Sequence, residues 1–165
     1  MLYEGKLETV WQVATSDKIS ADNPGGVATI DMLIPSSGGP GPHEHAQIEE
    51  SFYVIDGEIE VKSEFGENIA TKGAFVNISK GGIVHEFKNQ TDKVAHLLCI
   101  VVPAGLETFF EEVGKPVSYG EFLPPPQMDP ESAKQLQVIA EKHGQKVYPP
   151  DYWIRSGRPL SFPAR

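Results

Sequence analysis

Apolar and polar residues alternate along most of the first hundred positions. In residues 27–34 every second residue is apolar, which places Ala28, Ile30, Met32 and Ile34 on one face. This period of two indicates a strand with one buried face. Further strands are predicted at 52–55, 58–62, 73–78, 83–89 and 94–102. Many short strands with glycine-rich turns between them favour an antiparallel sandwich or barrel over residues 1–104.

The pattern changes after Val102. Leu106, Phe109, Phe110 and Val113 have the spacing of one helix face. A second helix is predicted from an Asp129 cap, with Ala133, Leu136 and Ile139 inward and a stop at Gly144. Residues 105–165 are therefore expected to form a short C-terminal helical extension and tail packed on the β domain.

The Asp56-Gly57 dipeptide predicts a two-residue hairpin turn between the strands at 52–55 and 58–62. In that hairpin Phe52, Val54, Ile59 and Val61 share one apolar, inward face. Glu50 has the same parity as Phe52 and also points inward. A lone buried carboxylate costs several kcal/mol unless it is neutral, paired or bound to a metal, so its position calls for a partner.

Three histidines are candidates for that partner. His43 and His45 have the same parity, and the four residues that follow allow a bend that returns Glu50 to the same place. His85 lies between Ile83 and Phe87 on an inward face. Each histidine alone is more typical of a surface or hydrogen-bonded core position. Together with Glu50 they favour a site for a divalent transition metal.

These residues resemble the two sequence motifs of the cupin superfamily. The first motif is matched by His43, His45, Glu50 and Gly57, and the second by Gly73, Gly82, His85 and Asn89. The second motif is one residue longer here, and Ser79-Lys80 stand where proline is usual. The resemblance covers roughly residues 27–104 and implies a small β-barrel of cupin or jelly-roll type. The segments "PAGLETFFEEVG" and "IAEKHGQKVYPP" are similar to the tail of single-domain, quercetin-dioxygenase-like cupins.

The resemblance implies that His43, His45, Glu50 and His85 hold one divalent metal, which is Fe, Mn, Ni, Co or Zn. Open positions on such a metal suit a dioxygenase acting on a phenolic or enolic, flavonol-like small molecule. Glu50 is then a ligand and the expected catalytic proton acceptor. A non-catalytic module that binds a metal and a small ligand is the alternative, as is a sugar isomerase or epimerase.

The distribution of arginine bears on the ligand. Arginine occurs only at 155, 158 and 165, so the predicted barrel lacks the fork that grips phosphate or carboxylate. An apolar substrate pocket is expected around the metal, lined by Met32, Phe52, Val54, Ile59, Val61 and Phe87. Each of these residues taken alone is equally compatible with an ordinary place in the hydrophobic core.

Charge and composition restrict the partners. The 165 residues carry a net charge of −9, which disfavours nucleic acid and anionic membrane surfaces. No apolar run approaches the roughly 20 residues of a membrane span, the N-terminus lacks a signal peptide's apolar core, and Cys99 is the single cysteine. A cytoplasmic homodimer is expected.

His96 is expected to be a hydrogen-bonded core or interface residue rather than a fourth pocket histidine. The tail aromatics Tyr148, Tyr152, Trp153 and Phe162 are expected to pack on the barrel or a neighbouring subunit.

Overall fold

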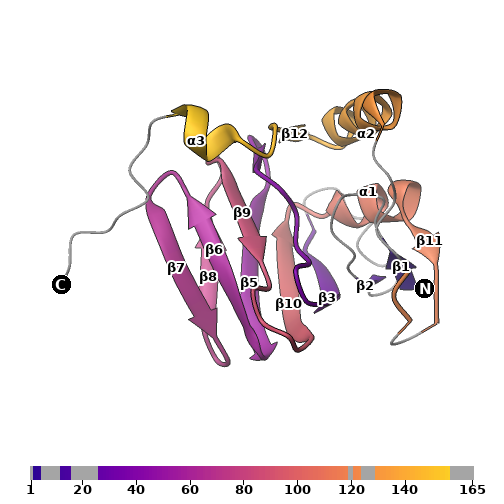
Figure 1. Cartoon of the computed structure of the whole chain (residues 1–165). Helices are drawn as coiled ribbons and strands as arrows, with labels where there is room; N and C mark the ends of the chain where they lie inside the picture. Colours follow the sequence, from indigo (N-terminus) through magenta and orange to yellow (C-terminus); the bar gives the residue numbers. More distant parts are fainter. Residues whose placement is uncertain (1, 5–11, 16–25, 119–120, 124–128, 157–165) are drawn as a thin grey trace.

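The computed structural model describes residues 2–4, 12–15, 26–118, 121–123 and 129–156. Their strands form two antiparallel sheets that face each other (Figure 1). The first sheet runs, in spatial order, β11 (Lys115–Pro116), β1 (Leu2–Glu4), β2 (Gln12–Thr15), β3 (Ala28–Ile34), β10 (Ala95–Val102), β5 (Glu49–Asp56) and β8 (Phe75–Ile78). The second runs β12 (Gln145–Val147), β4 (His43–His45), β9 (His85–Lys88), β6 (Glu58–Ser63) and β7 (Gly66–Thr71). Among the described residues no strand pairing joins the two sheets into a closed barrel.

The core lies between the sheets and follows the alternation of the sequence. In β3 and β10 every second residue is buried, because successive side chains of a strand point to opposite faces. The inward set includes Ile30, Phe52, Val54, Ile59 and Leu97, all of them 0% exposed. The prediction of a mainly β, antiparallel fold with a short C-terminal helical part is confirmed.

The predicted hairpin between β5 and β6 is wrong. β5 pairs with β10 and β8, whereas β6 pairs with β9 and β7. The Asp56-Gly57 reversal instead carries the chain from one sheet to the other. Gly57 has φ +77°, and a Cβ there would lie 3.0 Å from Ala95 Cα. The dipeptide specifies a sharp reversal, but the partner of each strand depends on tertiary packing. The apolar residues of both strands still point inward, as predicted, because the two strands face each other across the core.

Both predicted helices are present. α1 (Leu106–Val113) buries its apolar face, and Asp129 caps α2 (Pro130–Lys142) by accepting a hydrogen bond from the Ser132 N–H at 2.7 Å. On α2, Leu136 is buried and Ile139 half-buried as expected, but Ala133 is exposed and Ala140 is buried in its place. The buried face of α2 is thus Leu136 with Ala140, four residues apart, and it excludes Ala133 at the first turn. A third helix, α3 (Tyr152–Ser156), follows.

The two helices are joined by a polar bridge. The His143 ring contacts Thr108 Oγ1 through Nδ1 at 3.0 Å and Glu112 Oε2 through Nε2 at 2.7 Å. Thr108 and Glu112 lie on α1, and His143 is the C-cap residue of α2. The bridge therefore fixes the end of α2 against α1, one residue before the turn at Gly144.

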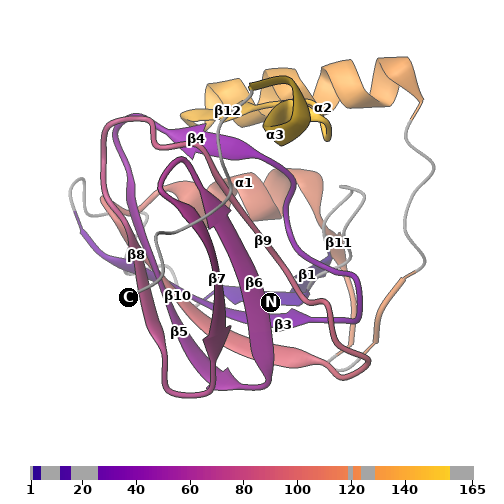
Figure 2. The same cartoon turned by 60° about the vertical axis from the view of Figure 1, so that its left-hand side comes forward.

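The segment after residue 104 does more than pack on the sheets. β11 extends the first sheet beside β1, and β12 extends the second sheet beside β4. α2, β12 and α3 lie across one end of the sheets, with α1 beneath them (Figure 2). The predicted boundary at residue 104, between a β domain and a C-terminal extension, stays a prediction. β11 and β12 lie beyond it, and each is a strand in a sheet that residues before 104 also form.

Asn89 fastens the loop that precedes β4. Its Nδ2 donates to the carbonyls of Ile34 and Lys93 at 2.8 and 2.6 Å, and its Oδ1 accepts from the Thr91 N–H at 2.9 Å. Its backbone N–H also donates to Gly38 O at 2.8 Å. The motif asparagine is thus a fully buried structural residue that holds the loop against the end of β9.

Candidate metal centre

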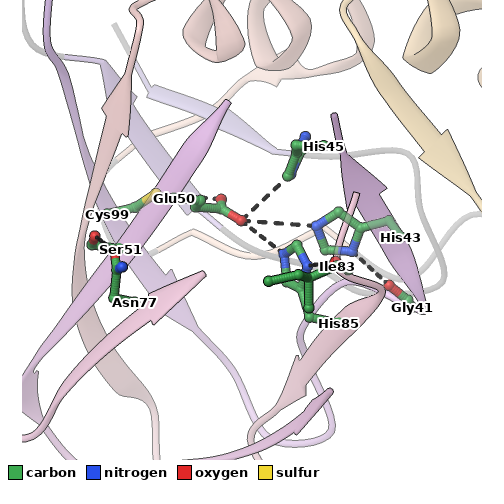
Figure 3. Close-up of polar contacts among 9 residues, drawn as sticks. All are labelled: Gly41, His43, His45, Glu50, Ser51, Asn77, Ile83, His85 and Cys99. Carbon is green, nitrogen blue, oxygen red and sulfur yellow. Dashed lines mark hydrogen bonds and ion pairs between the residues drawn. The ribbon is translucent and has the colours of Figure 1, made fainter. Parts of the chain in front are cut away.

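The four predicted ligands converge in the interior. β4 supplies His43 and His45, β5 supplies Glu50 and β9 supplies His85, all of them buried. The three imidazoles converge on one carboxylate oxygen of Glu50 (Figure 3). Glu50 Oε2 lies 3.0 Å from His85 Nε2, 3.4 Å from His45 Nε2 and 3.9 Å from His43 Nε2. All four ligand atoms lie within 4.8 Å of one another.

Backbone carbonyls orient two of the rings. His43 Nδ1 lies 2.9 Å from Gly41 O, and His85 Nδ1 lies 2.9 Å from Ile83 O. A carbonyl only accepts, so each Nδ1 carries the proton and donates it. In a neutral imidazole the other nitrogen, Nε2, then holds a lone pair directed at the centre. This is the outer support that metal-binding histidines commonly have.

These residues fit a divalent metal on their own chemistry. Lone pairs of neutral imidazoles that converge on a carboxylate oxygen repel one another, and a cation relieves that repulsion. His45 is 2% exposed, and neither of its ring nitrogens has a hydrogen-bond partner among the described residues. Ligand atoms at about 2.0–2.2 Å from a metal are about 3–4 Å apart, and the three distances to Glu50 Oε2 fall in this range. The donor set suits Fe, Mn, Ni, Co or Zn without choosing among them.

The electrostatics keep His43 and Glu50 in their metal-binding forms. Burial, with a smaller effect of the neighbouring His85 and His45, holds the pKa of His43 well below its usual value. Burial alone raises the pKa of Glu50, but hydrogen bonds and positive charge from His45 and His85, when these rings carry a proton on Nε2, outweigh that effect and leave the pKa well below the usual value. Near neutral pH, His43 is therefore neutral and Glu50 ionised, as ligands must be.

Cys99 lies behind the carboxylate. Its Sγ is 3.5 Å from Glu50 Oε1, and the residue is fully buried on β10. Burial, together with the Glu50 charge, raises the pKa of the thiol well above its usual value. Cys99 is therefore a protonated thiol that donates weakly to the far oxygen of Glu50.

A cavity adjoins this cluster. The centre of a water molecule can occupy about 30 Å³ of this cavity, which is room for about two waters. Its wall includes His43 and Glu50, together with Met32, Pro40, Phe87, Leu106, Phe109, Phe110 and Gln145. Of the pocket residues expected from sequence, Met32 and Phe87 lie in this wall. The other four, Phe52, Val54, Ile59 and Val61, belong to the core cluster.

Sequence reasoning missed the part of the wall that comes from the C-terminal segment. The apolar face of α1 was evident from its spacing, but the spacing does not say against which site that face packs. Gln145 had no signal in the sequence at all. The packing of α1 and the pairing of β12 with β4 bring both to the four-residue cluster.

The remaining sequence candidates lie elsewhere. His96 is a half-buried β10 residue, hydrogen-bonded through Nε2 to Asp31 Oδ1, and it does not line the cavity. In the tail, Trp153 is buried, and the rings of Tyr148 and Tyr152 are 4.6 Å apart. Phe162 lies outside the described residues. No helix in the described part of the chain is long and apolar enough to cross a membrane.

Comparison with known proteins agrees with the fold. Residues 30–101 match the model of a cupin domain. A search of curated proteins gave no match. Among solved structures, a predicted oxalate decarboxylase from Thermotoga maritima is similar with a TM-score of 0.54 and 16% identity, over 62% of this chain and 90% of that one.

Two further structures show the same fold. The Cnp3 cupin domain of Schizosaccharomyces pombe has a TM-score of 0.50 at 18% identity, over 64% of this chain and 73% of that one. A sugar phosphate isomerase of the cupin superfamily from Silicibacter pomeroyi has a TM-score of 0.51 at 16% identity, over 58% of this chain and 60% of that one. Identities this low speak to the fold alone. Residues 30–101 therefore match a cupin domain, and this part of the chain contains all four residues of the buried His-His-Glu-His cluster.

Proposed function

We propose that this protein is a metal-dependent dioxygenase that acts on a phenolic or enolic small molecule with adjacent oxygens, as in quercetin-dioxygenase-like cupins. His43, His45, Glu50 and His85 would hold one divalent metal. When bound, a redox-active metal would supply the Lewis acidity and electron transfer that oxygen chemistry requires. Glu50, ionised beside the imidazoles, would accept the proton of an incoming hydroxyl group.

The observation that carries this proposal is the character of the cavity wall. Apart from the ligands His43 and Glu50 and the amide of Gln145, it is built from apolar and aromatic side chains. Among the described residues it contains no lysine or arginine. A neutral or weakly acidic ligand suits such a wall, whereas phosphate and dicarboxylate groups lack a cationic partner other than the metal.

Two alternatives come from different classes. The solved neighbours include a sugar phosphate isomerase and a predicted oxalate decarboxylase, but the wall's lack of a basic residue argues against either substrate. A non-catalytic module that binds a metal and a small ligand is compatible with the same cavity. Metal analysis of protein purified without added metal distinguishes the dioxygenase from these alternatives, because zinc has no redox chemistry. Iron, manganese, nickel or cobalt supports the oxygenase, and full zinc occupancy supports binding, hydrolysis or isomerisation.

Glu50→Gln should remove most turnover in an oxygen-uptake assay. An amide is a weaker metal ligand than a carboxylate and accepts no proton at neutral pH, so we expect a loss on the order of 100-fold. The assay uses protein loaded separately with Fe(II), Mn(II), Ni(II) and Co(II). Because the cavity is small, the substrate panel begins with compact enediols and catechols and then extends to flavonols. Ligand binding without oxygen uptake in any metal form would replace the dioxygenase with the binding module.

We also propose a cytoplasmic homodimer, supported by acidic composition and by apolar side chains near sheet edges. Tyr53 and Phe75 lie directly opposite each other on β5 and β8 and are 43% and 61% exposed. In the described part of the chain β8 ends the first sheet, and exposed apolar residues beside such an edge favour pairing. Light scattering at micromolar concentration should give about twice the chain mass of 18.1 kDa. A monomer mass would contradict the dimer.

A further inference from the structure

Gln145 is a buried polar residue whose amide nitrogen has no hydrogen-bond partner among the described residues. The residue is 7% exposed. It lines the cavity together with His43 and Glu50. Leaving a buried amide N–H unpaired costs about 1–3 kcal/mol, so this position lowers stability unless something in the cavity accepts its hydrogen bond.

The fold aims Gln145 at the metal centre. β12 pairs antiparallel with β4, and in this register Gln145 lies directly opposite His45. Directly opposite residues of an antiparallel pair project from the same face of the sheet, so Gln145 points inward as His45 does. The turn before β12 is made by Gly144, at φ +75°, and the His143 bridge holds the preceding helix end against α1.

Apart from His43, Glu50 and Gln145 itself, the side chains that line the cavity have no strong hydrogen-bond acceptor. α1 contributes Leu106, Phe109 and Phe110, and the sheets contribute Met32 and Phe87. These are apolar side chains. The polar groups that share the cavity with Gln145 are therefore the metal ligands His43 and Glu50, whose lone pairs are directed at one another.

From this geometry we propose that Gln145 is a ligand-orienting residue, whose Nε2–H donates to an acceptor oxygen of the molecule bound beside the metal centre. With a metal held by the four ligands, one oxygen of that molecule would bind there, and a neighbouring oxygen would accept from Gln145. The inference rests on the metal centre in the proposed function, but it does not require turnover. A neutral donor suits an uncharged or weakly acidic oxygen, and it selects against ligands with no second acceptor.

Small anions that bind metals test this role. The probes are formate, which leaves a second oxygen free to accept, and N-bound thiocyanate, whose free end is a sulfur and a weak acceptor. Dissociation constants are measured from the visible spectrum of Co(II)-loaded protein. The main variant is Gln145→Met, which keeps the length of the side chain and removes the donor. Gln145→Leu is the second variant, in case methionine disturbs packing. Gln137→Leu, an exposed change on α2, is the matched control.

We expect Gln145→Met to bind formate about tenfold more weakly and thiocyanate with unchanged affinity. Its melting temperature should equal or exceed that of the wild type, because an unpaired buried amide is removed. Gln137→Leu should alter neither affinity. A merely structural glutamine predicts the opposite pattern, with a lower melting temperature and equal loss for both probes. That pattern, or unchanged formate binding in both Gln145 variants, would overturn the inference.

The result also separates this inference from the dioxygenase proposal. Selective loss of formate affinity without oxygen uptake by any metal form supports Gln145 and removes the dioxygenase. Oxygen uptake by the wild type, with unchanged formate binding in the Gln145 variants, supports the dioxygenase and removes the proposed role of Gln145. A wild-type protein that binds no Co(II) defeats both.

Discussion

The double substitution His43→Ala and His85→Ala is expected to abolish divalent metal binding in a folded protein. It removes two of four ligand atoms, including the nearest imidazole to Glu50 at 3.0 Å. Loss of an outer partner of a metal ligand already costs about 10–100-fold in affinity, so loss of two ligands should exceed that range. Metal content per chain is measured by elemental analysis after loading and desalting, with far-ultraviolet circular dichroism to confirm the fold.

His96→Ala is the matched control for this experiment. His96 lies on β10, is bound to Asp31 and does not belong to the cluster. Its replacement should leave metal content unchanged. Equal metal content in the wild type and the double variant would show that the four-residue cluster is not the metal site.

Gly39→Ala is expected to destabilise the protein by about 3 kcal/mol or more. Gly39 has φ +130°, and a Cβ there would lie 2.1 Å from the carbonyl oxygen of Phe87. The obstacle is backbone of β9, so it cannot rotate away. The loop must shift, and this loop leads directly into His43, so metal affinity should fall together with stability. Urea unfolding with and without metal measures both effects.

Gly41→Ala provides the control two residues further along the same loop. A Cβ at Gly41 meets nothing within 4 Å, and its φ is not positive. Its effect should stay within about 0.5 kcal/mol, as for ordinary surface substitutions. Similar destabilisation by both variants would mean that the approach of the loop to β9 does not limit the fold.

Local patterns predicted the elements of this protein well. The period of two in residues 28–34 and 95–102 gave the buried faces of β3 and β10, because a strand's side chains must alternate. The apolar face of α1 and the Asp129 cap of α2 were equally evident, because both depend on residues within a few positions of each other. The alternation of side chains also placed Glu50 in the interior. Because a lone buried carboxylate is unfavourable, this position indicated a partner, and the three inward histidines were the candidates.

Strand partners could not be predicted in this way. Asp56-Gly57 favours a tight reversal whether the next strand returns to the same sheet or crosses to the other, and here it crosses. The free energy that decides between them comes from burying whole sheet faces against each other, which involves residues far apart in the sequence. The inward faces are the same in both arrangements, so the four candidate ligands are buried despite the error in the pairing.

The sequence by itself therefore determined which side chains face the interior and that four of them could bind a metal. Only the tertiary structure decided what encloses that metal centre. It brought α1 and β12 to the cluster, left Phe52 and Val54 in the core, and set Gln145 opposite His45. Periodicity is a property of neighbouring residues, whereas the wall of a cavity is assembled from segments about 100 residues apart, whose meeting depends on how all the faces pack at once.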